Sequence, residues 1–457
     1  MLPELYPHQD NALLKADPKL AIFWSPRLGK SRYAAEWLRH LWAKEYIFAD
    51  ANGLSVVIAP LNVCPQWMDV LQAAMPYLPL KAGYGLSGAS LRSWLSTKPR
   101  GVLVLSDSLL GPCIEALLKC RPEALVVDES HRFIGAGTKR GRAMRRLAWK
   151  TPYVRLLTGT PAPNHEGNLW GQMAAIDPDK WEKSYTRFAK KHLIRDSMFP
   201  SKVYGVQRPL ELQAMLNASA DIVRREDVFG PDTWQEIVRE VDLDPKTMRL
   251  YKQLAKDKIL EAPDLTAENA GVLLVRLSQI TAGILPSDDG EEQDLPSPKL
   301  NACIADLEEI VEEGGKAIIY YKFQREGERA ETAIAKAFPN AEVLRLGGDT
   351  SINDREYIYE AVEAADHPVI AVVQIQAGGI GRSFAEAQYE GFLTEGPSFS
   401  EVEQAKDRIY KRGARRVVTR YRCRNTVDTG IFGAIQDYKE TLHDRIRTSD
   451  RAEWVGF

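Results

Sequence analysis

The stretch LAIFWSPRLGKSRYAAEWLRHL, from Leu20 to Leu41, joins an apolar run, a short polar loop and a helix-like pattern in direct succession. The apolar run predicts a buried strand, and apolar residues at helical spacing after Ser31 predict a helix. A loop between such a strand and helix presents backbone N–H groups at the positive end of the helix dipole, which suits phosphate groups. The Lys30 ammonium can reach the β- and γ-phosphates, and the Ser31 hydroxyl can hold Mg²⁺. We therefore predict a site for a nucleoside triphosphate and Mg²⁺, formed by Arg27, Leu28, Gly29, Lys30 and Ser31.

The Gly-Lys-Ser triplet alone does not establish a phosphate loop. Such triplets arise by chance on the order of once in several chains of this length at average residue usage. In addition, Trp24 occupies the place of the usual first glycine. The strand before the loop, the helix after it and the motifs downstream favour phosphate binding.

The composition is that of an ordinary soluble globular chain. Its 457 residues are enough for two or three domains. With 44% hydrophobic residues, 27% charged residues and a net charge of −2, the chain has no overall positive field, so any polyanion site has to be a local patch. The five cysteines are scattered without a Cys-x-x-Cys pair, which argues for reduced thiols and against structural zinc. No stretch resembles a signal peptide or a membrane span, so we expect a cytoplasmic protein without a membrane partner.

A carboxylate pair follows one of the strands predicted in the first half. Apolar runs at 55–60, 102–105 and 124–127, separated by helix-length segments, predict a parallel sheet covered on both faces. Asp128 and Glu129 follow the third run, at the edge where open parallel sheets bind ligands. There Asp128 would hold Mg²⁺, and Glu129 would orient and deprotonate an attacking water. An exposed pair of acids at a strand end is the alternative, which the upstream phosphate loop disfavours.

Strands begin again in the second half, where apolar runs at 317–321, 341–346 and 369–373 predict another parallel sheet. No phosphate loop follows the first of them, so this lobe would contribute to the nucleotide site from across a cleft. We expect an α/β protein with two doubly wound parallel-sheet lobes and helical accessory insertions between them. The expected boundaries are lobe 1 at 1–228 with a helical insertion at about 166–222, accessory helices and a linker at 229–298, and lobe 2 at 299–457.

Four motifs occur in the order and approximate spacing of superfamily-two helicases. They are Leu5-Tyr6-Pro7-His8-Gln9, Leu28-Gly29-Lys30-Ser31, Asp128-Glu129-Ser130-His131, and Leu157-Thr158-Gly159-Thr160-Pro161 with Asn164. Within that superfamily the chain resembles the Swi/Snf-like branch, the DNA translocases, because Arg224-Arg225-Glu226-Asp227-Val228 is similar to the branch's Arg-Arg-x-x-Asp-Val segment. The resemblance covers nearly the whole chain, from Gln9 to about Asp428, and the small size suits a bacteriophage or bacterial member. It implies two RecA-like lobes with ATP bound between them and a nucleic acid lying across both.

The resemblance implies roles for residues of the first lobe. Gln9 would read the adenine edge, as the family's glutamine motif does. Thr158, Gly159 and Thr160 would couple the nucleotide state to the acid pair, although by chemistry alone this segment could equally be a turn.

In the second lobe, the segment 374–384 is similar to the family's fifth motif, and its glycines, among them Gly379 and Gly381, would let backbone approach phosphates. The segment 404–413 is similar to the sixth motif, in which Gln404 and Arg408 would face the γ-phosphate. Arg408 is the expected arginine finger. The family usually has His-Arg where this chain has Tyr410-Lys411, so the second finger is either Lys411 or Arg412, and a solvated basic helix face is the alternative for the segment.

The nucleic-acid track should consist mostly of phosphate contacts, because a translocase cannot depend on sequence. Pro60 with Gln66 and Trp67 is similar to the family motif that lines this track, and Gln376 of the fifth motif is a further candidate. Two basic clusters are candidates as well, although each could be a solvated charged face: Lys139, Arg140, Arg142, Arg145 and Arg146, and Arg415, Arg416, Arg420, Arg422 and Arg424.

We expect a monomeric nucleic-acid-dependent ATPase that uses ATP and Mg²⁺ to translocate on duplex, forked or branched DNA in replication, recombination or repair. It would act in the cytoplasm of a bacterial or phage-infected host cell, with other replication or recombination proteins as candidate partners. An RNA helicase is one alternative, which Asp-Glu-Ser-His, Thr-Gly-Thr and the 224–228 segment argue against. A nucleotide-gated scaffold that has lost hydrolysis is another, which intact Lys30, Asp128, Glu129 and Arg408 argue against.

Overall fold

The computed structural model describes residues 4–43, 53–196, 203–230, 234–261, 267–285, 292–376, 383–396, 399–409 and 416–432. These residues divide into two compact units, the first up to residue 230 and the second from residue 234. Within the described ranges, no helix combines the length and apolarity that crossing a bilayer requires.

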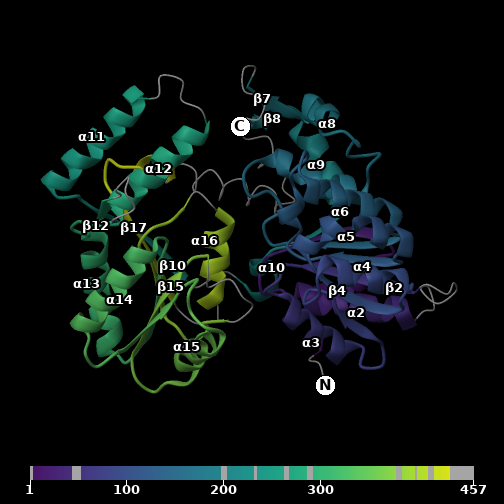
Figure 1. The fold of residues 1–457 in the computed structure, drawn as a ribbon, viewed down its shortest axis with the longest axis horizontal. Coiled ribbons are helices and arrows are strands. Elements are labelled where there is room, and N and C mark those ends of the chain that lie inside the picture. The colour runs from purple at the N-terminus through teal and green to yellow at the C-terminus, as the bar shows by residue number, and fades with distance from the viewer. Residues whose placement is uncertain are drawn as a thin grey trace. The chain divides into compact units, whose positions relative to one another are not determined.

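The first unit, coloured from purple to teal in Figure 1, is built on a sheet of seven parallel strands in the order β3-β4-β2-β5-β6-β1-β9. Its central strands are buried along their whole length, because helices cover both faces, and this burial explains the continuous apolar runs of the sequence. The strands are β1 (Lys19–Trp24), β2 (Leu54–Ala59), β3 (Leu80–Ala82), β4 (Gly101–Ser106), β5 (Ala124–Val127), β6 (Tyr153–Leu157) and β9 (Ala220–Val223).

Two apolar cores lie on the two faces of this sheet. Helices α1 (Pro7–Leu13), α2 (Lys30–Ala43) and α3 (Cys64–Ala74) contribute to one core. The other core takes residues from α4 (Gly88–Ser96), α5 (Asp107–Cys120), α6 (Lys139–Lys150), α7 (Leu169–Ile176), α8 (Tyr185–His192) and α9 (Pro209–Asn217). The short helix α10 (Arg225–Phe229) and the hairpin of β7 (Leu193–Arg195) and β8 (Val203–Val206) complete the unit.

The second unit repeats the plan with six parallel strands in the order β10-β17-β16-β13-β15-β14. The strands are β10 (Trp234–Val241), β13 (Lys316–Tyr321), β14 (Glu342–Leu346), β15 (Val369–Gln374), β16 (Tyr389–Phe392) and β17 (Arg416–Cys423), and the short strands β11 (Ile284–Leu285) and β12 (Gln293–Asp294) form a separate pair. The helices are α11 (Pro245–Glu261), α12 (Ala267–Thr281), α13 (Pro298–Glu312), α14 (Gln324–Ala337), α15 (Ile352–Ala364) and α16 (Phe399–Lys406). Two parallel α/β sheets, one in each unit, confirm the predicted fold class.

The segment 229–298, expected as accessory helices and a linker, lies largely within the second unit. Strand β10 joins its sheet beside β17, and α11 and α12 pack through Tyr251, Leu277 and Ile280 against Cys423 and Val427. The segment 166–222 is also not purely helical, because it contains the β7–β8 hairpin and most of β9.

Candidate active site of the first unit

The predicted phosphate loop connects the end of β1 to the start of α2, so the expected strand, loop and helix are present. Arg27 and Gly29 have φ values of 66° and 73°, which are left-handed conformations. At Gly29 a side chain would also collide with the Gln9 amide, so only glycine fits this position.

Gln9 braces this loop from α1. Its Nε2 donates to the carbonyl oxygens of Gly29 (3.0 Å) and Leu28 (3.3 Å), and its Oε1 accepts from the Tyr6 N–H (2.8 Å). The side chain is buried, as expected for an amide whose two ends are both bonded. The role at the adenine edge stays a prediction, and bracing the loop is a contact that the motif alone did not indicate.

Lys30 begins α2 and extends back along its own loop. Its Nζ donates to the carbonyl oxygens of Trp24 (3.0 Å) and Ser25 (3.3 Å). The positive charge is also close enough to the acid pair to favour the ionised forms of both Asp128 and Glu129. The structure therefore brings Lys30 and the two predicted acids into one site.

The two acids have different environments. Burial and repulsion from Glu129 raise the pKa of Asp128 to about 6, while the Trp67 indole N–H, which donates to Asp128 Oδ2 at 2.8 Å, acts in the opposite direction. Glu129 has a left-handed backbone, with φ 46°, and its N–H donates to Asp128 Oδ1 (2.9 Å). Burial alone would raise the pKa of Glu129. The contact of Glu129 Oε2 with His131 Nδ1 (3.2 Å) and nearby positive charges outweigh this effect and lower the pKa. Adjacent carboxyl groups are thus driven toward different protonation states.

The Thr-Gly-Thr segment after β6 lies beside the acid pair and the phosphate loop. His131 Nδ1 lies 2.9 Å from Thr158 Oγ1 and 3.3 Å from Thr160 Oγ1, and the Thr160 N–H donates to Thr158 Oγ1 (3.0 Å). A Cβ at Gly159 would lie 3.0 Å from the Pro26 ring, so this glycine permits a close approach to the loop. The predicted coupling segment therefore contacts both parts of the site.

A Mg²⁺ ion would find oxygen donors here that suit it. Mg²⁺ is usually held by one or two carboxylates together with water and substrate phosphates. Asp128 would supply a carboxylate, and Ser31 in the first turn of α2 would supply a hydroxyl oxygen. Among the described residues, no cluster of three or more His, Cys, Asp or Glu side chains offers another metal site. The donor set fits Mg²⁺ bound with a nucleotide.

Three predicted nucleic-acid contacts, Pro60, Trp67 and Arg145, are wrong because their side chains are buried. Trp67 lies in the core against Asp128, so it orients the acid instead of facing a track, and Pro60 is buried too while Gln66 is exposed. Arg145 donates to the Ala136 carbonyl (2.9 Å) and stacks on the Trp170 ring at 4.6 Å. Burial lowers the pKa of Arg145 to about 10. Arg140 is partly exposed and remains a candidate.

In the second unit, Arg408 lies in the short 3-10 helix Asp407–Ile409, and its side chain is largely buried. Its carbonyl oxygen accepts from the Phe384 N–H (2.8 Å) and from Ser383 Oγ (2.9 Å), so the end of the fifth motif holds the backbone that carries the expected finger. Gln376 is exposed, and the backbone of Gln404 lies in α16. Gly379, Gly381, Lys411 and Arg412 lie outside the described residues.

The second basic cluster is mostly internal, which contradicts its assignment to a DNA track. Arg420 pairs with Glu395 and Glu236, both at 3.2 Å, and Arg422 pairs with Glu395 at 3.4 Å. Arg416 donates to backbone carbonyls, and the exposed Arg424 pairs with Glu240 and Asp242, while Arg415 lies outside the described residues.

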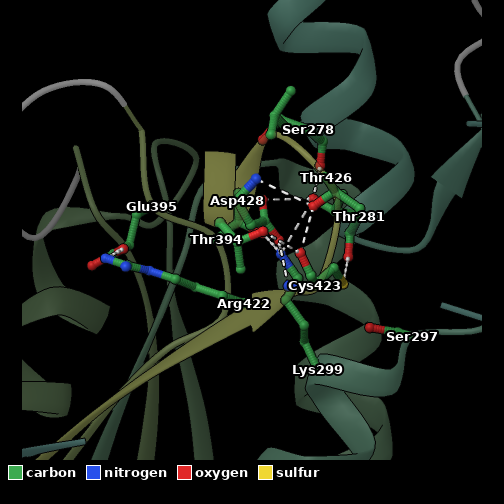
Figure 2. A network of polar contacts seen from close by, with 12 residues as sticks. Ser278, Thr281, Ser297, Lys299, Thr394, Glu395, Arg422, Cys423, Thr426 and Asp428 are labelled. Atoms are coloured by element: carbon green, nitrogen blue, oxygen red, sulfur yellow. Dashed lines mark hydrogen bonds and ion pairs between the residues drawn. The ribbon is translucent and has the colours of Figure 1, made fainter. Parts of the chain in front are cut away.

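A buried ammonium lies near the carboxyl end of β17. Figure 2 shows the Lys299 side chain directed at Thr394 and Asp428, at Nζ distances of 2.8 Å and 3.2 Å. Thr394 in turn donates to Glu326 (2.6 Å), and Asp428 accepts from Thr281 (3.0 Å). Although burial works in the opposite direction, Asp428 and Glu326 raise the pKa of Lys299 above its usual value. This network joins α12, α13 and the segment after β17, and sequence patterns gave no indication of it.

Comparisons with known proteins agree with these motifs. The sequence profile of the SNF2-related domain matches residues 31–284, more than half of the chain. A Bacillus subtilis protein, YwqA, whose name describes an ATP-dependent helicase/translocase, is 23% identical over 417 residues, covering 88% of this chain and 44% of that protein. Protein p41 of Acyrthosiphon pisum secondary endosymbiont phage 1 is 29% identical over 350 residues, covering 72% of this chain and 73% of that protein.

A vertebrate relative matches over a similar range. The Xenopus tropicalis SWI/SNF-related matrix-associated actin-dependent regulator of chromatin subfamily A-like protein 1 is 20% identical over 399 residues, covering 85% of this chain and 40% of that protein. The chain therefore spans less than half the length of this relative and of the Bacillus protein.

Among solved structures, the Sulfolobus solfataricus SWI2/SNF2 ATPase core in complex with dsDNA is 21% identical, with a TM-score of 0.43, covering 99% of this chain and 94% of that chain. The ATPase core domain from the same organism gives 19% identity and a TM-score of 0.44, covering 98% of this chain and 92% of that chain.

Proposed function

Because the chain belongs to the family of the SNF2-related domain, we propose that it is a DNA-dependent ATPase that translocates on duplex or branched DNA. The observation that carries this proposal is the convergence of Lys30, Asp128 and Glu129 at the carboxyl edge of one parallel sheet. The names of relatives, which refer to ATP-dependent helicases, support the same activity.

In this proposal the residues of the first unit divide the work. The Lys30 ammonium neutralises phosphate charge, and Ser31 and Asp128 hold Mg²⁺. Bound Mg²⁺ supplies Lewis-acid polarisation of phosphate oxygens. Trp67 fixes the orientation of the Asp128 carboxylate through its indole N–H.

Glu129 is the general base of the proposed reaction. A base must be deprotonated before it can accept a proton from water, and the lowered pKa of Glu129 meets this condition. The contacts of His131 with Glu129, Thr158 and Thr160 offer a route by which movement of the Thr-Gly-Thr segment would change the position of the base.

The first test is steady-state ATP hydrolysis by the full chain, alone and with duplex DNA, forked DNA, single-stranded DNA or RNA. We expect DNA to stimulate hydrolysis, RNA to stimulate it little, and the stimulation to weaken with salt because phosphate contacts release counterions. Stimulation by RNA alone would favour the RNA helicase, and no hydrolysis under any condition would favour a nucleotide-gated scaffold.

The second test separates binding from chemistry. We expect Lys30→Ala to abolish turnover and weaken ATP binding, and Glu129→Gln to retain ATP binding while lowering turnover by at least about 10²-fold. Asp69→Asn, at an exposed position of α3, is the matched carboxylate control and should leave both unchanged. Wild-type turnover in Glu129→Gln would contradict the assigned base.

Movement along DNA requires its own measurement. Displacement of a triplex-forming strand from duplex DNA, dependent on ATP and lost in Glu129→Gln, is the expected result for a translocase. The proposal extends to a role in replication, recombination or repair, with other proteins of those processes as partners.

A further inference from the structure

A basic hollow with a volume of about 750 Å³ lies between helices α5 and α6 of the first unit. These helices are neighbours on one face of the sheet (Figure 1). The apolar lining includes Pro112, Ile114 and Ala143, and the charged lining contains four cations and one carboxylate: Lys139, Arg140, Arg142, Arg146 and Asp107.

Three of these cations form one stripe on α6. Lys139, Arg142 and Arg146 occupy positions i, i+3 and i+7 of the helix, so they share one face and extend over about 10 Å at 1.5 Å per residue. Arg146 pairs with Glu115 at 2.9 Å. In the part of the chain that the structure describes, Lys139 and Arg142 are exposed and have no carboxylate within ion-pair distance.

The hollow is linked to the acid pair through one carboxylate. Asp107, buried at the start of α5, accepts from Arg132 Nε (2.7 Å) and from Arg140 Nη1 (3.3 Å). Arg132 lies three residues after Glu129 and its charge helps to lower the pKa of that base. An anion that attracted Arg140 away from Asp107 would therefore change the ion pair between Asp107 and Arg132, which lies near the catalytic base.

The hollow also lies at the appropriate edge of the sheet. Helix α5 begins directly after β4, and α6 begins ten residues after Glu129, beyond the short 3-10 helix Ser130–Phe133. Both helices therefore follow strands that end at the carboxyl edge, as does the phosphate loop after β1. Four strand spacings separate β4 from β1 in the sheet order, which is about 19 Å at 4.8 Å per strand. A ligand in the hollow would thus lie beside the nucleotide site without overlapping it.

We propose that the hollow between α5 and α6 binds the sugar–phosphate backbone of DNA. This proposal rests on the proposed function, because it identifies the surface through which the motor holds its track. A row of cations spaced about 4.5 to 6 Å apart along a helix suits a repeating anion better than one small anion. One strand of DNA supplies a phosphate every 3.4 Å of axial rise, so the stripe corresponds to about three phosphates.

The direct test measures DNA binding without nucleotide, by fluorescence anisotropy of a labelled duplex over about 50 to 200 mM salt. We expect Lys139→Gln/Arg142→Gln to weaken binding at least about tenfold and to make the slope of log K against log salt shallower by about two. The control is Lys150→Gln, which removes one charge from the last residue of the same helix, outside the hollow. The control should change binding much less than the double variant.

A second pair of variants tests the hollow by adding charge. A Cβ at Gly111, inside α5 and lining the hollow, would meet nothing within 4 Å, so a side chain fits there. Glu and Lys have similar helix propensities, and both exceed glycine, so Gly111→Glu and Gly111→Lys should fold equally well. We expect Gly111→Glu to weaken duplex binding and Gly111→Lys to strengthen it.

The outcomes distinguish this proposal from the proposed function. If DNA stimulates ATP hydrolysis by the wild-type protein while the double variant binds DNA as the wild type does, the hollow is excluded and the motor stands. Equal effects of Gly111→Glu and Gly111→Lys would also overturn the proposal. A hollow that binds RNA and not DNA, with the same dependence on Lys139 and Arg142, would overturn the assignment to DNA.

Discussion

Two runs of basic residues, 139–146 on α6 and 416–424 on and after β17, have similar density in the sequence but opposite environments in the structure. On α6 the cations at positions 139, 142 and 146 are exposed around a hollow. On β17 the side chains of Arg416, Arg420 and Arg422 are buried, and two of them are paired with carboxylates of neighbouring strands and loops.

The difference shows that periodicity of charge does not by itself reveal a binding surface. The arginine side chains of β17 are buried, so their polar groups need partners inside the protein. A surface helix has one face free, and its cations on that face need no such partners. The first run is thus available to a ligand, whereas the buried arginines of the second run already have partners within their own unit.

The largest expected effect comes from breaking the buried charge network beside β17. Lys299→Met would leave Asp428 and Glu326 buried without their cation, and removing one partner of a buried pair typically costs about 3 to 5 kcal/mol of unfolding free energy. Urea unfolding at neutral pH measures this loss. The double variant Lys299→Met/Asp428→Asn should recover part of it, and a loss below about 1 kcal/mol in the single variant would contradict the assigned network.

A smaller effect distinguishes two arginines that lie three residues apart on α6. Arg145→Met removes the hydrogen bond of a buried guanidinium to Ala136 and its contact with Trp170, so we expect unfolding free energy to fall by about 1 to 3 kcal/mol. Arg142→Met, at an exposed position, should stay within about 0.5 kcal/mol of the wild type. The affinity for duplex DNA should show the reverse order: Arg142→Met should weaken it, and folded Arg145→Met should leave it unchanged. If the two variants had equal effects on unfolding free energy and on affinity, the assignment of Arg145 to the core and of Arg142 to the binding surface would be wrong.

The third effect depends on pH and concerns Glu390, fully buried on β16. Burial raises the pKa of Glu390 well above its usual value, although Lys406 and Arg408 act against this shift. The folded chain then keeps a proton that the unfolded chain releases above about pH 4.3, so unfolding free energy should fall as pH rises, by at most about 1.4 kcal/mol per pH unit.

Glu390→Gln removes this titratable group. The unfolding free energy of the variant, relative to that of the wild type, should therefore increase as pH rises from about 5 to 8. Urea unfolding of both proteins across this range is the measurement. A difference that does not vary with pH would show that Glu390 is ionised in the folded chain.

The strands that are buried on both faces could be predicted from the sequence, because such strands consist of continuous apolar runs. The sequence did not indicate β16, whose four residues include Glu390 and Gly391, or β10, an edge strand whose residues 235–240 are exposed. Strand β3 has three residues and β9 four, which is too short for a periodic signal.

In the candidate site, local motifs predicted those residues whose side chains carry the chemistry and which also follow a strand. Lys30, Asp128 and Glu129 each follow a strand that ends at the same edge, and the structure brings them together. The role of Trp67 was missed because it acts through a contact with Asp128, 61 residues away in the chain. The burial of Arg145 was missed for a related reason, because only the packing of α7 against α6 covers that face.

The bond between Trp67 and Asp128 gives the protein a spectroscopic reporter at its catalytic centre. An indole N–H can only donate, so its strength as a donor to Asp128 depends on the charge of that carboxylate. The indole ¹H–¹⁵N resonance of Trp67, assigned by comparison with Trp67→Phe, should therefore move when Mg²⁺ or nucleotide changes the state of Asp128. Events at the acid pair could then be followed in solution without attaching a label.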